Sequence, residues 1–500
     1  MTFIRSLRAV LLLSSAVAMP GADDRLANLT KAVTEFRLAN GAQFFVVERP
    51  QSPLIAFHLR VKAGVADEPA GQGGVSMLAL VNFLDGSEIY GTRNLPQEKA
   101  ALAEAAKLLA ANRAEEAKGD QADEIKKGRA DYQARAAFDR AAQLGVGPHF
   151  YDNVLAQNGV TGFEARTGAD FSDMAFTLPS HRAELFFRMM GSWIQAPSPR
   201  FFYQSRTLVG EQRAQASKTG VWQRERAFGG AFTVHPYRAI GAPDTELATL
   251  GADEVQAFLK AHYRPGNLTV GIVGDIAPAE ARRLAEFYFG RIPAGVLDEP
   301  KGATPLKAEG AAQLHLALPE APMFAAAWPR PAGHEAGDAV FDMLQAILGG
   351  GAGSRLHTEL MVDAQLARRM SVMARYPGGR YPGLFLIEAE PLPTRAHEDL
   401  EAGINKALET ISKSGVTAED LERGRQWWRG RMLADSRTAA SRAQQLVRSA
   451  TEFGSYKVEE RMVQLEKVTA QDCQRVVAEF LAGKAYFSVI QLTAVDGEAQ

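Results

Sequence analysis

Cysteine is nearly absent from the 500-residue chain, which contains only Cys473. A single thiol excludes an internal disulfide and any thiolate-rich zinc or iron–sulfur site, and a lone cysteine in a helical pattern is typical of an inert buried thiol. The formal net charge is only −2, which gives no electrostatic reason to expect nucleic acid or an anionic membrane as a partner. The 46% hydrophobic share is that of an ordinary globular protein, and the length predicts two to four domains.

Paired histidines are absent as well. The chain has nine histidines, and no two of them lie within four residues of each other. No helix of this chain can therefore present two imidazoles one turn apart, which is the arrangement that binds zinc in helical metal motifs. Three separate histidines could still converge in space, so a metal site of another kind stays open as an alternative. The nine are His58, His149, His181, His235, His262, His315, His334, His357 and His397.

Long apolar runs are missing too, apart from a short one near the N-terminus. Arg5 and Arg8 precede an apolar run over residues 9–18, which is followed by small residues and Pro20. This order is typical of a secretory signal peptide, with residues 16–18 as the cleavage box. About ten apolar residues are too few to span a bilayer. The sequence therefore predicts an exported protein, periplasmic if the source is bacterial, with no transmembrane span.

Two segments of the chain resemble each other. "LGADEVQAFLKAHYRPGNLTVGIVGD" (residues 250–275) aligns without a gap with "VTAQDCQRVVAEFLAGKAYFSVIQLT" (residues 468–493), at an offset of 218. Each has the pattern of a capped amphipathic helix followed by a β-rich strand. The strands that begin at Gly41 and Ala311 also pair, at an offset of 270. The sequence thus predicts two homologous halves, and the difference of 52 residues between the offsets measures extra chain in the first half.

The extra chain lies at about residues 97–143. This stretch is rich in Ala, Glu, Lys and Arg and has almost no β-branched residue, which predicts a solvated helix or helical hairpin, broken near Gly119. Elsewhere, strands such as "IAFHLRVKAG" (residues 55–64) alternate apolar and polar positions, as half-buried antiparallel strands do. The predicted fold class is therefore α+β: two homologous halves, each made of antiparallel sheet with helices packed on one face, plus the charged helical insertion.

Four segments follow one another in an order that is characteristic of a known family. A glycine-rich turn leads into an apolar helix in "VKAGVADEPAGQGGVSMLALVNFLDGS" (residues 61–87), and "FTVHPYRAIG" (residues 232–241) contains His-Pro-Tyr. "HYRPGNLTVGIVGDI" (residues 262–276) ends a strand in Val-Gly-Asp, and "ILGGGAGSRLHTEL" (residues 347–360) begins a helix after three glycines. Together these segments resemble the pitrilysin/insulinase-like zinc metallopeptidases, of the inverzincin, bacterial processing-peptidase type. The resemblance implies halves that close like a clamshell around a peptide chamber.

The resemblance implies a metal motif that this chain does not carry. The family places His-x-x-Glu-His in the helix after the glycine-rich turn, where the histidines bind Zn²⁺ and the glutamate activates the bound water. By position, these residues correspond to Met77, Leu80 and Val81, none of which can serve as the family requires. The third ligand, a glutamate of a later helix, corresponds to Glu211, which is retained. We therefore expect no catalytic residue, no bound metal and no cofactor; zinc is implied only if an unrecognised metal site exists.

The second half departs from the family pattern as well. Active members, or the helper half of split ones, place an Arg and a Tyr seven residues apart, where they bind the substrate carbonyl and stabilise the oxyanion. Met361 and Arg368 occupy those positions, so the tyrosine hydroxyl is missing. This pattern is similar to that of metal-binding subunits whose Arg/Tyr pair is supplied by a partner chain. For His235, the family role is the packing of a loop.

The resemblance and its departures predict a non-catalytic exported homologue of zinc metallopeptidases that binds polypeptide or partners an active peptidase subunit. Two alternatives stay open: an active zinc endopeptidase with an unrecognised metal site, and a structural subunit of an envelope complex. The expected partners are a metal-bearing homologous subunit and a polypeptide, with no nucleic acid. The expected division of the chain is a signal peptide (1–22), an N-terminal half (23–296) with the insertion (about 97–143), a linker (297–310) and a C-terminal half (311–500).

Overall fold

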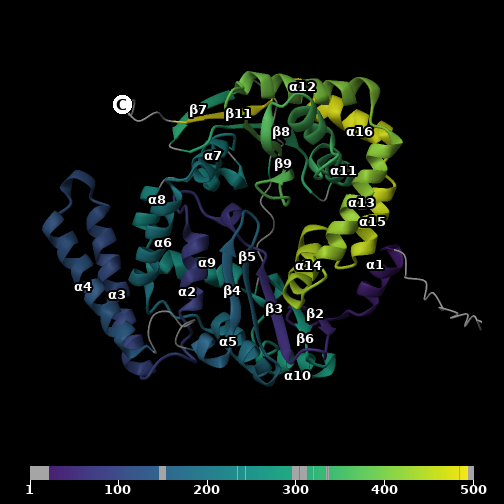
Figure 1. Cartoon of the computed structure of the whole chain (residues 1–500). Helices are drawn as coiled ribbons and strands as arrows, with labels where there is room; N and C mark the ends of the chain where they lie inside the picture. Colours follow the sequence, from purple (N-terminus) through teal and green to yellow (C-terminus); the bar gives the residue numbers. More distant parts are fainter. Residues whose placement is uncertain are drawn as a thin grey trace, which may run out of the picture.

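The computed structural model shows two α+β halves that lie against each other (Figure 1). Apart from Ala22 and Ala303, the expected signal peptide (1–22) and linker (297–310) lie outside the described residues. No helix in the described part of the chain is both long and apolar enough to cross a membrane. The structure describes residues 22–145 and 154–493, except for 233, 234, 243, 296–302, 304–311, 319, 334, 336 and 484.

The first half contains a six-stranded sheet in the order β1-β2-β6-β3-β5-β4. Only β2 and β6 run parallel, because β6 returns to the sheet through a helix, whereas its other neighbouring strands pair in opposite directions. The two edges of the sheet are β1 and β4. The strands are β1 (Thr34–Arg37), β2 (Gln43–Glu48), β3 (Leu54–Val61), β4 (Thr161–Thr167), β5 (Ser172–Pro179) and β6 (Leu268–Gly274).

The second half repeats this sheet without its first strand. Its order is β7-β11-β8-β10-β9, which matches β2-β6-β3-β5-β4 strand by strand, and β7 and β11 form its parallel pair. The structure therefore confirms two homologous α+β halves, with one parallel pair in each otherwise antiparallel sheet. The strands are β7 (Ala312–Leu318), β8 (Met323–Arg330), β9 (Ala367–Tyr376), β10 (Gly383–Pro391) and β11 (Phe487–Thr493).

Each sheet forms a hydrophobic core with helices of its own half. The first core joins its sheet to α2, α5, α9 and α10, and the second joins its sheet to α11, α12, α15 and α16. Cys473 is fully buried in the second core, where burial raises the pKa of its thiol to about 12. The N-terminal helix α1 also belongs to the second core, through the buried Leu26.

The helices of the body are α1 (Ala22–Lys31), α2 (Val75–Leu84), α5 (Ala183–Gln195), α6 (Phe202–Ala216), α7 (Gly220–Gly229), α8 (Asp244–Thr249), α9 (Ala252–His262), α10 (Pro278–Tyr288), α11 (Asp338–Gly349), α12 (His397–Ser414), α13 (Ala418–Ala434), α14 (Ala439–Glu452), α15 (Val458–Glu466) and α16 (Ala470–Val476). Short helical turns used below are η6 (Pro236–Gly241) and η8 (His357–Asp363).

The other face of each sheet is contacted by a helix of the opposite half. α14 lies against β3 and β6 of the first sheet, and α7 lies against β7 and β11 of the second. Both helices begin at a threonine N-cap, Thr219 or Thr438, whose hydroxyl accepts a backbone hydrogen bond of the first turn. Gly271 of β6 permits the close approach of α14, because a Cβ there would lie 2.5 Å from the carbonyl oxygen of Ala443. The sequence predicts helices on one face of each sheet. The structure adds a helix from the opposite half on the other face.

Asp170, in the turn between β4 and β5, fastens the two halves at their junction. Its carboxylate accepts hydrogen bonds from the backbone N–H groups of Gly379 and Arg380 in the second half, at 2.8 and 3.0 Å. The Tyr237 hydroxyl donates to the same carboxylate at 2.9 Å and accepts from the N–H of Tyr381 at 3.2 Å. Hydrogen bonds to a charged group contribute about 1.5–3 kcal/mol each, so this carboxylate is a strong cross-link.

A helical hairpin stands beside the first half where the sequence predicts the insertion (Figure 1). It consists of α3 (Leu95–Glu116) and α4 (Glu124–Leu144), and the chain turns between them at Gly119, whose φ of +59° favours glycine. A buried ion pair between Glu98 and Arg200, 3.0 Å from Oε1 to Nε, ties the base of the hairpin to the body. The rest of the hairpin is mostly solvated, as its charged sequence predicts.

α2 lies inside the first core and not at its surface. Leu78, Ala79, Leu80 and Phe83 have no exposed surface, and they pack among side chains of the sheet, α5 and α9. An uncharged helix of this kind is stable where most of its circumference is covered. The apolar run after the glycine-rich turn is therefore explained by burial.

Replacing Asp170 with Ala should lower the free energy of unfolding by about 2–4 kcal/mol, because it leaves the Tyr237 hydroxyl and two backbone N–H groups without their acceptor. Urea unfolding followed by circular dichroism measures this loss. Asp139→Ala, on an exposed position of α4, is the matched control and should change stability by less than about 0.5 kcal/mol. Equal losses in the two variants would contradict the cross-linking role of Asp170.

Leu80→Glu should lower the free energy of unfolding by about 3 kcal/mol or more, because it places a carboxyl group in a fully apolar site. Leu54→Glu, at a position where the side chain is 42% exposed, is the control and should cost less than about 1 kcal/mol. Thermal and urea unfolding of both variants provide the comparison. A Leu80→Glu protein as stable as the control would show that α2 is not a core helix.

Candidate functional site

The glycine-rich turn before α2 is built around a buried carboxylate. Gly74, the N-cap residue, has a φ of +93°, a left-handed conformation that favours glycine. The N–H groups of Gly74 and Ser76 donate to the Glu68 carboxylate at 2.9 and 3.1 Å, and the Ser76 hydroxyl donates at 2.5 Å. A carboxylate at this end of a helix satisfies N–H groups that have no partner within the helix. Burial nevertheless raises the pKa of Glu68 to about 7.

The three positions that correspond to the family's metal motif carry packing residues in the structure. Leu80 has no exposed surface, while Met77 and Val81 are half-buried and pack against the first core. The Met77 thioether lies 3.8 Å from the Thr167 hydroxyl at the end of β4. α2 therefore presents a thioether and aliphatic groups at these positions.

Glu211 does not lie beside these residues in the way the position-by-position comparison implies. It is exposed on α6 and does not line the hollow beside α2. Val209, Gln212 and Arg213 of the same helix do line it, although Gln212 is exposed as well. Because neighbouring residues on a helix point about 100° apart, Gln212 lines that hollow, as Met77 does, while Glu211 does not. The retained carboxylate therefore lies outside the hollow that Met77 lines.

A hollow of about 410 Å³ opens between α2, α6, α7 and the end of β4, and we name it the α2 cavity. Side chains from both halves contribute, because Tyr376 and Pro377 of the second half close one side. Its apolar wall consists of Val65, Met77, Ala169, Val209, Ala216, Trp222, Ala239, Ile240, Tyr376 and Pro377. Its polar wall consists of Glu68, Ser76, Thr167, Gln212, Arg213 and Glu225, together with the backbone of Gly74 and Gly168.

Sequence reasoning missed most of this wall. Trp222 and Tyr376 lie far from α2 in the sequence, and only the fold brings them to it. Glu68 had a signal, since a carboxylate shortly before a glycine-rich helix start is a common cap. The sequence signal for Gln212 was weaker: it directly follows Glu211, the residue at the family's third-ligand position.

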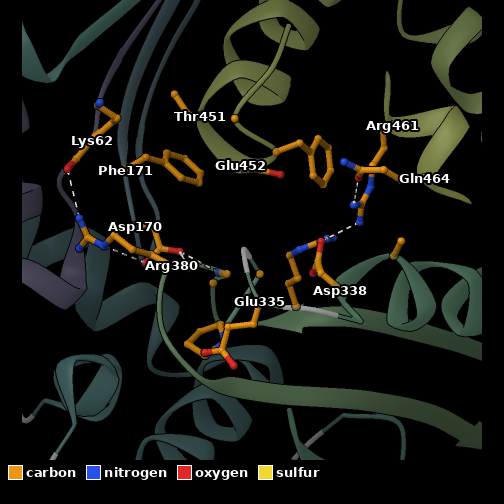
Figure 2. Close-up of a pocket in the computed structure, with 18 of the residues that line it drawn as sticks. Lys62, Asp170, Phe171, Glu335, Asp338, Arg380, Thr451, Glu452, Arg461 and Gln464 are labelled. Atoms are coloured by element: carbon orange, nitrogen blue, oxygen red, sulfur yellow. Dashed lines mark hydrogen bonds and ion pairs between the residues drawn. The ribbon is translucent and has the colours of Figure 1, made fainter. Parts of the chain in front are cut away.

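A second hollow of about 700 Å³ lies at the junction of the halves and is strongly charged (Figure 2). Arg380 extends from the second half to Asp67, 2.7 Å away, and also lies near Asp170. Arg461 contacts Asp338 at 2.7 Å on the opposite wall. Lys62 lines the same hollow, and burial together with nearby arginines lowers the pKa of its ammonium group. Since cationic and acidic side chains of both halves line it, this hollow is a polar seam between the halves.

The positions that replace the family's Arg and Tyr lie elsewhere in the second half. Met361, in η8, packs against the second core. Arg368, on the edge strand β9, is exposed and is paired with Glu390, 2.6 Å from Nε to Oε1. Neither residue lines the α2 cavity or the junction hollow. Arg368 is therefore engaged in a surface ion pair.

His235 is buried in the loop before η6, as expected of a packing residue. Its Nδ1 accepts the N–H of Tyr237 at 3.1 Å, and its ring lies against those of Phe232 and Tyr381. Burial lowers the pKa of this imidazole. Because Tyr237 contacts Asp170, the His235 loop also belongs to the junction of the halves.

In the described part of the chain, no three His, Cys, Asp or Glu side chains converge in the manner of a metal site. The groups around the α2 cavity can accept and donate hydrogen bonds and can contact apolar side chains. The arrangement is suited to binding.

Two sequence comparisons relate the chain to known proteins. Residues 249–426 match the family model described as the Peptidase M16 inactive domain. The chain is also 24% identical over 260 residues to an uncharacterized zinc protease of Streptomyces coelicolor. That alignment covers 50% of this chain and 55% of the relative, so the match spans about half the length of each.

Solved structures share the whole fold. A protease from Helicobacter pylori matches with a TM-score of 0.69 at 17% identity, over 92% of this chain and 99% of that one. The periplasmic protease PqqL of Escherichia coli matches with a TM-score of 0.65 at 14% identity, over 94% of this chain and 49% of that one. The sequence matches and the four ordered segments support a pitrilysin-like, or M16, family member, and the solved structures show that the chain has the fold of such peptidases.

Proposed function

We propose that the chain is a non-catalytic member of this family that binds an extended polypeptide along β4 and partners a metal-bearing homologue. The observation that carries the proposal is the combination of an open sheet edge with a helix whose metal-motif positions hold Met77, Leu80 and Val81. The edge provides a way to bind a polypeptide backbone. The helix provides no histidine or carboxylate with which to cleave it.

The binding surface is the outer edge of β4. β4 pairs with β5 on one side, and no strand in the described residues pairs with its other side. An exposed edge presents N–H and C=O groups that an extended chain can pair with, which is a recurrent mode of peptide recognition. β4 also ends at the α2 cavity, through Thr167 and Gly168. A strand added there would therefore gain backbone hydrogen bonds and a place for a side chain.

The absence of cleavage follows from the chemistry of the side chains. Metal-dependent hydrolysis needs ligands that hold the ion and a base that activates its water. Leucine and valine provide neither, and a single thioether does not hold a catalytic zinc. Glu68 is a buried carboxylate at the start of α2, but it already accepts hydrogen bonds from Ser76 and Gly74. On this basis we assign no catalytic residue, no metal and no cofactor to the chain.

The proposed partner is supported by a similar structure with a longer chain. The fold of residues 22–493 aligns with 49% of the periplasmic protease PqqL, so that longer chain has room for two units of this size. The described residues form one such unit, and a homologous unit on a partner subunit would complete the chamber. The hairpin of α3 and α4 is a suitable docking arm, because Ile125 and Tyr132 are 84% and 74% exposed and lie two turns apart on α4.

The proposed location is outside the cytoplasm, and the periplasm if the source is bacterial. The support is the basic, apolar and small-residue order of residues 5–20, together with the fold shared with a protein described as periplasmic. A partner would then have to be exported to the same compartment. Peptide binding with no partner and no metal would favour an independent binding protein, and stable assembly without peptide binding would favour a structural subunit.

Purified protein without a histidine tag should contain far less than one zinc per chain after dialysis, and it should bind a labelled extended peptide without cleaving it. Elemental analysis measures the metal, fluorescence anisotropy the binding, and mass spectrometry the integrity of the peptide. A family member with an intact His-x-x-Glu-His motif, treated identically, is the control and should retain about one zinc. Stoichiometric, chelator-sensitive zinc with peptide cleavage would establish the alternative of an active endopeptidase.

Co-expression with an intact-motif homologue from the same source should give a complex on size-exclusion chromatography and a changed turnover of a fluorogenic peptide. A stable interface of this kind buries about 1,200 Å² or more in total. Ile125→Asp with Tyr132→Asp should weaken the complex at least tenfold if the hairpin docks, whereas Val463→Asp, also at an exposed position, should leave it unchanged. A homologue that elutes alone with unchanged turnover would rule out an accessory subunit.

A further inference from the structure

We propose that a second copy of this chain docks on an outer surface formed by the start of α5, the end of α10 and the turn after α2. The two copies meet around a two-fold axis, so that Glu184 of each copy pairs with Arg188 of the other. This inference goes beyond the proposed function and does not depend on peptide binding. We name the surface the α5 surface, and it consists of Ile89, Tyr90, Glu184, Arg188, Phe287 and Tyr288.

The turn after α2 holds two large apolar side chains out in solvent. Ile89 and Tyr90 are 45% and 40% exposed. The Ser87 hydroxyl accepts hydrogen bonds from the N–H groups of both residues, at 3.2 and 3.0 Å. Arg200, which is fully buried, donates to the carbonyl oxygen of Ser87 at 2.6 Å. Because the turn is fixed from within, a partner that contacts its tip orders few groups, and the entropy cost of binding is small.

The end of α10 continues the α5 surface beside α5, along the lower edge of the molecule in Figure 1. The two helices approach closely at Gly191, where a Cβ would lie 2.9 Å from the carbonyl oxygen of Tyr288. The Tyr288 hydroxyl donates to Glu184 at 2.5 Å, and its ring centre lies 4.9 Å from that of the exposed Phe287. The two rings and the carboxylate therefore form one connected area.

Arg188 connects this area to the turn. Its guanidinium lies 5.3 Å from the centre of the Tyr90 ring. Burial and Glu184 raise the pKa of the Tyr288 hydroxyl to about 12, and Arg188 and Tyr90 are near enough to act on it as well. The turn, α5 and α10 thus contribute to a single surface of aromatic rings with one cation and one anion.

The two charges of the α5 surface do not pair with each other. Glu184 and Arg188 are four residues apart on α5, a spacing at which helices commonly form ion pairs. In the described part of the chain they form none: Glu184 accepts from Tyr288, and Arg188 lies over Tyr90. A carboxylate and a guanidinium are therefore both available to a partner.

A second copy of the chain matches this arrangement of charges. A two-fold axis across α5 makes the helix run antiparallel to its copy, and every contact of residue i with residue j is then repeated as j with i. Glu184 and Arg188 consequently form two ion pairs across the axis, whereas a purely acidic or purely basic partner would leave one of them unpaired. Tyr90 and Phe287 add aromatic contacts of the kind that dominate interface energies. The α5 surface is thus complementary to itself.

The test is sedimentation-velocity ultracentrifugation of the full-length mature protein over a range of concentrations. The surface is smaller than a standard interface, so we expect a weak dimer with a dissociation constant of about 10 μM or more. Arg188→Glu and Glu184→Arg should each weaken it at least tenfold, because each places like charges opposite one another. The double variant should recover to within about threefold of the natural protein, since the pairs form again with reversed signs.

The recovery separates pairing between copies from effects within one chain. The double variant still lacks the hydrogen bond from Tyr288 to residue 184, so a local structural role of Glu184 predicts no recovery. An equimolar mixture of the two single variants should likewise form a dimer, because each Glu of one chain then meets an Arg of the other. Thermal unfolding of each variant verifies that it is folded.

Two exposed positions of α4 provide the matched controls. Arg129→Glu and Tyr132→Ala should leave the dissociation constant unchanged, whereas Tyr90→Ala should raise it at least fivefold. A natural protein that stays monomeric at about 200 μM would overturn the inference. So would a dimer that the folded single variants leave intact, or one that neither the double variant nor the mixture restores. None of these outcomes bears on peptide binding, so the proposed function is judged separately.

Discussion

In each half, the helices of that half cover only one face of the sheet. A helix of the opposite half covers the other face: α14 lies on the first sheet and α7 on the second. The contact is apolar on both sides: Phe45 and Val273 meet Leu446 of α14, and Phe228 of α7 meets Val489 of β11. A sheet face that stays in water loses the stabilisation of burial, about 25 cal/mol per Å² of apolar surface. The two halves are therefore mutually dependent, and this exchange fixes how they lie against each other.

This dependence fixes the α2 cavity, because the cavity has walls from both halves. α2, α6 and β4 belong to the first half, while Tyr376 and Pro377 come from the second. Asp170 maintains their alignment, since it lies just beyond the end of β4 and receives the N–H groups of Gly379 and Arg380. The same few residues thus separate the apolar α2 cavity from the polar hollow at the junction.

The turn that leads into α2 keeps the family pattern, whereas the side chains of α2 at the metal-motif positions do not. The glycine-rich turn is complete, with Gly74 in a left-handed conformation and Glu68 bound to the first N–H groups of the helix. Those contacts determine how the backbone enters the helix, and they do not depend on which side chains follow. Met77 and Leu80 are then free to serve packing. A family scaffold can in this way persist where metal chemistry has no ligands.

The sequence by itself determined the two homologous halves, the helical insertion and the identities at the metal-motif positions. Strand alternation and helix caps are local signals that follow from local backbone preferences. The similarity of two segments 218 residues apart is visible by comparing the sequence with itself. Only the tertiary structure decided that α7 and α14 exchange between halves, that Glu211 lies outside the α2 cavity, and that Trp222 and Tyr376 complete this cavity. These features depend on the rotation of α6 about its axis and on contacts between residues far apart in the chain, and periodicity along one segment carries no information about either.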